Sequence, residues 1–105
     1  MNIIKQYLTV SNYNRPGTKR GSTTAVACHY IGNPGTSAQA NRNYFENLRT
    51  THTTKASAHY IIGLQGEIIQ MIPEEEISWC TNSANAYTIS IEACHPDSTG
   101  RFTAA

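Results

Sequence analysis

Short runs in which apolar and polar residues alternate make up most of the hydrophobic pattern of this chain. Alternation with a period of two predicts β-strands, and Gly, Pro, Asn or Ser residues bound these runs. Four such runs cover residues 24–30, 58–63, 67–72 and 88–94. A shorter amphipathic run at 3–8 predicts a further strand or edge segment. The Leu64-Gln65-Gly66 sequence predicts a hairpin turn between the second and third runs.

One segment shows helical spacing instead. Thr36 and Gln39 have the spacing of a capping box, which predicts a helix over about 37–50. A predicted helical face that packs on the sheet is formed by Ala40, Tyr44, Phe45 and Leu48. The order of elements predicts an α+β fold with a mixed central β-sheet and a flanking helix. Because one helix covers only one face, we expect self-association or packing against another chain through the uncovered sheet surface.

Composition narrows the classes of protein to consider. The 105 residues allow one domain, and a net charge of +1 without a basic face argues against nucleic acid as a partner. No apolar run approaches the ~18 residues of a membrane span, and no signal peptide opens the chain. The three cysteines form no C-x-x-C pair, which favours synthesis in a reducing cytoplasm. If the protein acts outside the cell, something else must release it.

Two residues on strand interiors are candidates for chemistry. His29 lies near the end of the run 24–30, just before a turn, and Glu92 lies within the run 88–94. Strand ends are fixed while the loops beyond them can shape a pocket, so this placement is typical of a built site. A hydrogen-bonded histidine and a solvated glutamate without any function are the more common case. Spacing alone leaves both interpretations open.

Four sequence motifs, which occur in a fixed order along the chain, are more informative than the spacing of these two residues. They are H-Y-x-x-N-P-G from His29, S-A-H-Y-I-I-G from Ser57, G-E-I-I-Q-x-I-P from Gly66, and S-I-E-x-C-H-P-D from Ser90. On these motifs the chain resembles the zinc-dependent N-acetylmuramoyl-L-alanine amidases. These are the type-2 amidases of phage endolysins and bacterial autolysins, which are related to the peptidoglycan recognition proteins. The resemblance covers almost the whole chain.

The resemblance implies a peptidoglycan hydrolase that cleaves the amide between N-acetylmuramic acid and the L-alanine of the stem peptide, with zinc-activated water. His29 matches the first zinc ligand, and the other ligands are expected beyond Ala105, so residues 1–105 would be a single amidase catalytic domain that lacks its C-terminal portion. Glu92 matches the general base, with Ser90 as a candidate to orient it. Asn33 and Trp79 are candidates for contact with sugar or stem peptide. Bacterial cell-wall peptidoglycan, reached after release from the cytoplasm, would be the partner.

The remaining polar residues support simpler interpretations. We expect His59 to be structural, His52 to be solvated, and His95 to diverge from its neighbour Cys94. The run 74–76 is expected to be a solvated turn, and Trp79 could equally cap the core. Because two zinc ligands are absent, a non-catalytic peptidoglycan-binding module or an inactive fragment is the alternative function. A thiol hydrolase that uses Cys28 or Cys94 is a third hypothesis.

Overall fold

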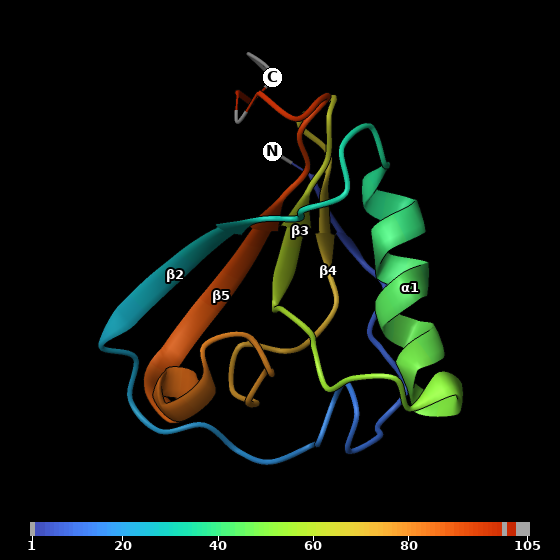
Figure 1. Cartoon of the computed structure of the whole chain (residues 1–105). Coiled ribbons are helices and arrows are strands. Elements are labelled where there is room, and N and C mark those ends of the chain that lie inside the picture. The colour runs from blue at the N-terminus through green and yellow to red at the C-terminus, as the bar shows by residue number, and fades with distance from the viewer. Residues whose placement is uncertain (1, 100, 103–105) are drawn as a thin grey trace.

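A five-stranded mixed sheet with one helix packed against it forms this chain, in a computed structural model that describes residues 2–99, 101 and 102 (Figure 1). The strands are β1 (Ile3–Lys5), β2 (Ala25–Tyr30), β3 (Tyr60–Ile62), β4 (Ile68–Gln70) and β5 (Thr88–Ala93). The helix α1 spans Ala38–Thr51, and a 3-10 helix η1 spans Asn82–Tyr87. The predicted α+β class and mixed sheet are confirmed.

The strand order in the sheet is β1-β4-β3-β5-β2. Only β3 and β4 are antiparallel, and they are joined by the predicted hairpin, where Gly66 has the positive φ of 82° that glycine adopts without strain. The other three pairs, β1 with β4, β3 with β5, and β5 with β2, are parallel. As a result, β2 lies at one edge and is bonded to β5 alone.

The predicted strand runs are correct in position but too long for β3 and β4. The backbone N–H groups of Met71 and Ile72 both donate to the carbonyl oxygen of His59, at 2.8 and 3.4 Å. Two residues of one strand then oppose a single residue of the other, as in a β-bulge, and this interrupts the ladder. The β3–β4 pairing is therefore limited to three residues on each strand.

The helix α1 begins one residue later than the capping box suggested. Ser37, and not Thr36, is the N-cap, because its side-chain oxygen accepts from the backbone N–H of Ala40 at 3.0 Å. The helix ends at His52, which has a left-handed φ of 55° and donates its backbone N–H to the Leu48 carbonyl at 3.1 Å.

The face that α1 buries also differs from the prediction. Ala38, Asn41, Phe45 and Leu48 are the buried helical residues. Ala40 and Tyr44, predicted to face the sheet, are exposed. Asn41 can be buried because its Nδ2 donates at 2.8 Å both to Thr36 Oγ1 and to the Ser37 carbonyl.

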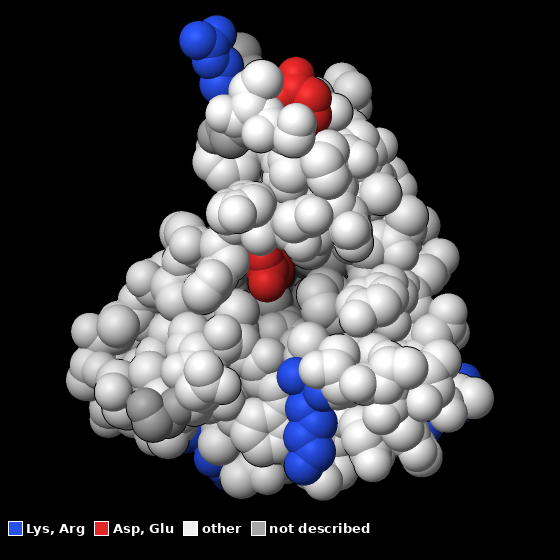
Figure 2. Space-filling view, in the orientation of Figure 1, with Lys and Arg blue, Asp and Glu red and all other residues white. Residues whose placement is uncertain are grey.

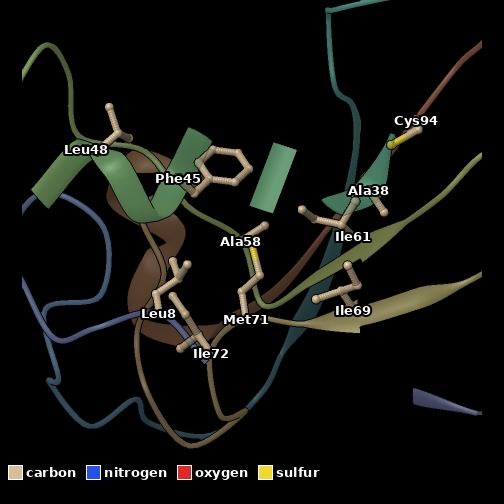
Figure 3. Packing of buried hydrophobic residues seen from close by; sticks show 10 residues of the cluster. All are labelled: Leu8, Ala38, Phe45, Leu48, Ala58, Ile61, Ile69, Met71, Ile72 and Cys94. Atoms are coloured by element: carbon tan, nitrogen blue, oxygen red, sulfur yellow. The ribbon is translucent and has the colours of Figure 1, made fainter. Parts of the chain in front are cut away.

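The hydrophobic core lies between α1 and the central strands. α1 packs against β3 and β4, and the chain after β1 and after β4 adds further apolar side chains from below (Figure 3). Packing of this kind is what makes the helix stable, since a helix of this length is marginal alone. The core consists of Leu8, Ala38, Phe45, Leu48, Ala58, Ile61, Ile69, Met71, Ile72 and Cys94.

The opposite face of the sheet carries exposed apolar side chains. Ile3, Val26 and Tyr30 are 45%, 59% and 65% exposed. Self-association through this face stays a prediction, which sedimentation at several protein concentrations can test. Within the described part of the chain, no helix has both the length and the apolar character that a membrane crossing requires.

Candidate active site

The register between β2 and β5 places His29 directly opposite Glu92. Side chains opposite each other on paired strands lie on the same face of the sheet. Glu92 is also opposite Ile61 on β3, so all three share the face that carries α1. The helix lies over β3 and β4 and leaves the β5–β2 side open (Figure 1). His29 is therefore exposed and Glu92 half-buried.

A cavity of about 500 Å³ opens at Glu92. Figure 2 shows this face hollowed, with an acidic side chain inside the hollow and a basic side chain below it. The distant segment 55–57 and the segment that leads into β5, which includes η1, form the other walls. The lining residues are Lys55, Ala56, Ser57, Trp79, Cys80, Asn82, Asn85 and Glu92.

The two carboxylate oxygens of Glu92 have different surroundings. Oε1 accepts a hydrogen bond from the Cys80 thiol, with a distance of 3.8 Å from Sγ. Oε2 is buried and has no hydrogen-bond partner among the described residues. Burial raises the pKa of Glu92, while His29 and the Cys80 hydrogen bond act against this rise. A raised pKa suits a carboxylate that exchanges a proton near neutral pH.

Cys80 is a hydrogen-bond donor in this site. Burial raises its pKa to about 11, and the charge of Glu92 adds to the effect. The thiol therefore stays protonated at neutral pH, whereas a nucleophile would need the thiolate. Cys28 is exposed, Cys94 is buried, and no cysteine bonds to a histidine within the described residues. This geometry does not favour the thiol hydrolase.

A network of hydrogen bonds holds the loop that carries Trp79 and Cys80. The Trp79 backbone N–H donates to Ser57 Oγ at 2.9 Å, and its indole Nε1–H donates to the Asn12 carbonyl at 2.8 Å. Asn85 Oδ1 accepts from the backbone N–H groups of Cys80 and Thr81 at 3.2 and 2.8 Å. These bonds hold the loop against Asn12 and Ser57 on one side and against η1 on the other, and this fixes the walls of the cavity.

Ser90 does not orient Glu92, contrary to the expectation from sequence. Its Oγ lies 2.6 Å from Ser78 Oγ, and its backbone N–H donates to His59 Nδ1 at 3.1 Å. Cys80 makes the hydrogen bond to Glu92 instead. Both Ser90 and Glu92 point to the same face, but Ser90 is buried beneath the 76–79 segment, so its hydroxyl is used there.

His59 has the structural role that was predicted. It is fully buried, and because Nδ1 accepts from the Ser90 N–H, the ring proton lies on Nε2, which donates to the Glu76 carbonyl at 2.7 Å. Both ring nitrogens are therefore satisfied by the backbone in the neutral form.

Protonation of His59 should destabilise the fold. Burial lowers its pKa below the ordinary value of 6.5, so the unfolded chain binds this proton at a higher pH than the folded chain. The free energy of unfolding should fall as the pH drops below about 6.5. Urea titrations from about pH 7.5 to about pH 5 measure this, and the difference from His59→Asn isolates it from the opposite contribution of Glu92. An equal slope in both proteins would contradict the assignment.

Three other residues lie apart from the cavity. His95 Nε2 accepts from the Gly32 backbone N–H at 3.1 Å. The exposed His52 stacks on the Tyr13 ring at 4.1 Å. Asn33 lies in the turn between β2 and α1, where its carbonyl accepts from Thr36, and it does not line the Glu92 cavity.

The run 74–76 is not simply a solvated turn. Glu76 forms an ion pair with Arg15, with Oε1 2.8 Å from Nε and Oε2 2.8 Å from Nη2. Glu74 accepts a hydrogen bond from the Tyr60 hydroxyl. The paired charges fix the chain after β4, whereas the exposed side chain of Glu75 makes no hydrogen bond or ion pair with a described residue, and its carbonyl accepts from the Arg20 backbone N–H at 2.8 Å.

A catalytic zinc needs three protein ligands and a water. His29 and Glu92 are neighbours, but no group of three His, Cys, Asp or Glu side chains that could hold a metal occurs within the described ranges. The described residues therefore do not fit a complete zinc site, and His29 offers one ligand.

Sequence reasoning missed Lys55, Cys80 and Asn85 as residues of the cavity. Lys55 and Cys80 lie in loop segments and Asn85 lies in the short helix η1, where the sequence shows no periodicity that indicates the path of the chain. Their place around the cavity depends on how the segments 55–57 and 79–85 fold next to β5. Trp79 and Glu92, by contrast, do come together as candidates for one site.

Comparison with known proteins places this geometry in a family. The family model for N-acetylmuramoyl-L-alanine amidase (Amidase_2) matches residues 19–105. The N-acetylmuramoyl-L-alanine amidase CwlL of Bacillus licheniformis aligns over 105 residues at 31% identity. The alignment covers 88% of this chain and 29% of that protein.

Solved structures also match this chain in fold. The catalytic domain of XlyA matches with a TM-score of 0.75 and 30% identity, over 90% of this chain and 61% of that one. A mutant endolysin from Bacillus subtilis matches with a TM-score of 0.74 and 29% identity, over 91% of this chain and 62% of that one. This chain spans less than a third of the curated relative and about three-fifths of the solved domains. By sequence and by fold, the chain belongs to the Amidase_2 family of N-acetylmuramoyl-L-alanine amidases.

Proposed function

We propose that this chain contributes the catalytic face of a peptidoglycan hydrolase that cleaves the amide between N-acetylmuramic acid and the L-alanine of the stem peptide. The observation that carries the proposal is Glu92, held on a strand beside His29 with one buried, unpartnered oxygen at a cavity large enough for part of a peptide. The names of the relatives support the amide as the bond attacked.

In this proposal Glu92 moves the protons. It accepts one from the attacking water and passes one to the departing amine, which otherwise leaves poorly. Cys80 donates its hydrogen bond to Oε1, and Oε2 is buried without a hydrogen-bond partner among the described residues. Trp79 lines the cavity and offers a flat apolar surface to substrate. A substrate contact by Asn33 stays a prediction, because Asn33 lies outside this cavity.

Zinc enters the proposal through His29 alone. We propose that His29 is one ligand and that the remaining ligands come from other parts of the whole protein, as the resemblance implies. The cell wall would be reached after release from the cytoplasm.

Incubation with purified cell walls tests the function. Release of stem peptides with new L-alanine amino termini supports the amidase. Binding to walls without release would favour the non-catalytic peptidoglycan-binding module, an alternative supported by the incomplete ligand set of the described residues. If the protein neither binds the walls nor releases stem peptides, both proposed functions are contradicted.

The 105-residue chain should lose zinc on dialysis. One imidazole supplies a third of the protein ligands of a catalytic site, so the metal content should fall well below about one ion per chain. Atomic absorption after dialysis measures it, and His29→Ala should remove the residual binding while His52→Ala should not. About one tightly held zinc per chain would mean that other histidines, or neighbouring chains, complete the site.

A further inference from the structure

Lys55 is the cation of the cavity in which Glu92 is the anion. These two are the charged residues among those that line it. Lys55 is exposed, and it forms no ion pair with a carboxylate in the described part of the chain. An ammonium group at the rim of a cavity, without an ion-pair partner among the described residues, is available to an anionic ligand.

The backbone around Lys55 is fixed by the segments that it faces. The next residue, Ala56, donates its backbone N–H to the Tyr13 carbonyl at 3.1 Å. Ser57 donates its backbone N–H to the Trp79 carbonyl at 3.0 Å and accepts from the Trp79 N–H at its side chain. These bonds bring Lys55 next to both aromatic residues.

The side chain of Lys55 lies over two rings that are themselves held in place. Its Nζ is 5.9 Å from the centroid of the Tyr13 ring and 5.9 Å from that of Trp79. Tyr13 is stacked on His52, and the indole of Trp79 is bonded to the Asn12 carbonyl. The rings attract the cation through their π-faces and limit its positions, but they leave its N–H groups unused.

The cavity size limits where the anion can lie relative to the amide. A space of about 500 Å³ is about 10 Å across, the length of about three residues of extended peptide. A carboxylate at Lys55 therefore belongs to the first two or three residues beyond the amide at Glu92.

We propose that Lys55, placed over Tyr13 and Trp79, binds a carboxylate of the stem peptide close to the amide that Glu92 attacks. The site would thus select stem peptides with a free carboxyl group over those in which that group is amidated. This inference rests on the proposed function and names the substrate class of the same cavity.

Two muramyl dipeptides test the proposal, one with a free carboxyl group on its second residue and one with the primary amide there. Calorimetric titration of the 105-residue chain gives the dissociation constants. Lys55→Met should weaken binding of the free acid by about tenfold to a hundredfold, as expected for loss of a hydrogen bond to a charged group, and leave binding of the amide unchanged. Lys55→Arg should retain most of the affinity, and added salt should weaken binding of the acid alone.

Lys5→Met is the matched control, because Lys5 is exposed on β1 at the far edge of the sheet. It should leave both constants unchanged. If Lys55→Met weakens both peptides equally, or neither, the carboxylate site is wrong while the proposed function stands. If the unmodified chain binds neither peptide, the proposed function fails and this inference with it.

Discussion

Replacing Glu92 by glutamine in the active enzyme should lower the turnover of amide hydrolysis by about 10²–10⁴-fold, the usual contribution of a general base. The substitution keeps the shape of the side chain and its acceptor oxygen for Cys80, so the fold should be intact. It removes the carboxylate, which is the proposed proton acceptor at the cavity. Stem-peptide release from purified walls measures the rate, and circular dichroism checks the fold.

Glu75→Gln is the matched control. Glu75 is an exposed carboxylate outside the cavity, and its loss changes the net charge by the same amount. Its turnover should equal that of the unmodified enzyme. Near-normal hydrolysis by Glu92→Gln would remove Glu92 from the mechanism, whereas equal losses in both variants would indicate a general effect of charge on wall binding.

Replacing Phe45 by alanine should cost about 3–5 kcal/mol of the free energy of unfolding. Phe45 is 6% exposed and lies between α1 and the sheet, in the centre of the core (Figure 3). Truncation loses the transfer free energy of the ring and leaves a void that the sheet cannot fill. The total free energy of unfolding of a native protein is about 5–15 kcal/mol, so a large part of the stability depends on this residue. Urea unfolding measures the change.

The adjacent Tyr44 offers a control in the same helix. It is an aromatic residue with 46% of its surface exposed, and Tyr44→Ala should cost less than about 1 kcal/mol, as is usual for surface substitutions. Its edge contact with Phe45, at 5.5 Å between centroids, would be lost in either variant. Equal costs for the two substitutions would show that the helix packs through a different face in solution.

The helix shows where sequence reasoning succeeds and where it stops. Its position was predicted to within a residue, because apolar spacing and the capping-box spacing of Thr36 and Gln39 are local signals. The predicted buried face was rotated, because hydrophobic spacing included Ala40 and Tyr44 but not Asn41. A buried asparagine is acceptable only when its amide is bonded, and here Thr36 and Ser37 supply the acceptors. These hydrogen bonds form only in the folded turn, so the hydrophobic pattern of the sequence does not predict the burial of Asn41.

The same distinction holds for the candidate site. His29 and Glu92 lie on strands that alternation predicted, and the register of the folded sheet sets them side by side. Cys80 and Lys55 reach the cavity through loops that are held by hydrogen bonds between distant segments. The sequence contains these residues but not the bonds that bring them together, and only the three-dimensional structure identifies them.

The position of β2 at the edge of the sheet has a consequence for how the chain folds during synthesis. β2 bonds only to β5, which leaves the ribosome about sixty residues later, and such distant pairings form slowly. In that interval β3 and β4 can already form their local hairpin, while β2 has no partner and presents two open edges. Unpaired edges attract other unfolded chains. The nascent protein is therefore most exposed to aggregation before Thr88–Ala93 is translated, and His29 meets Glu92 only when that interval ends.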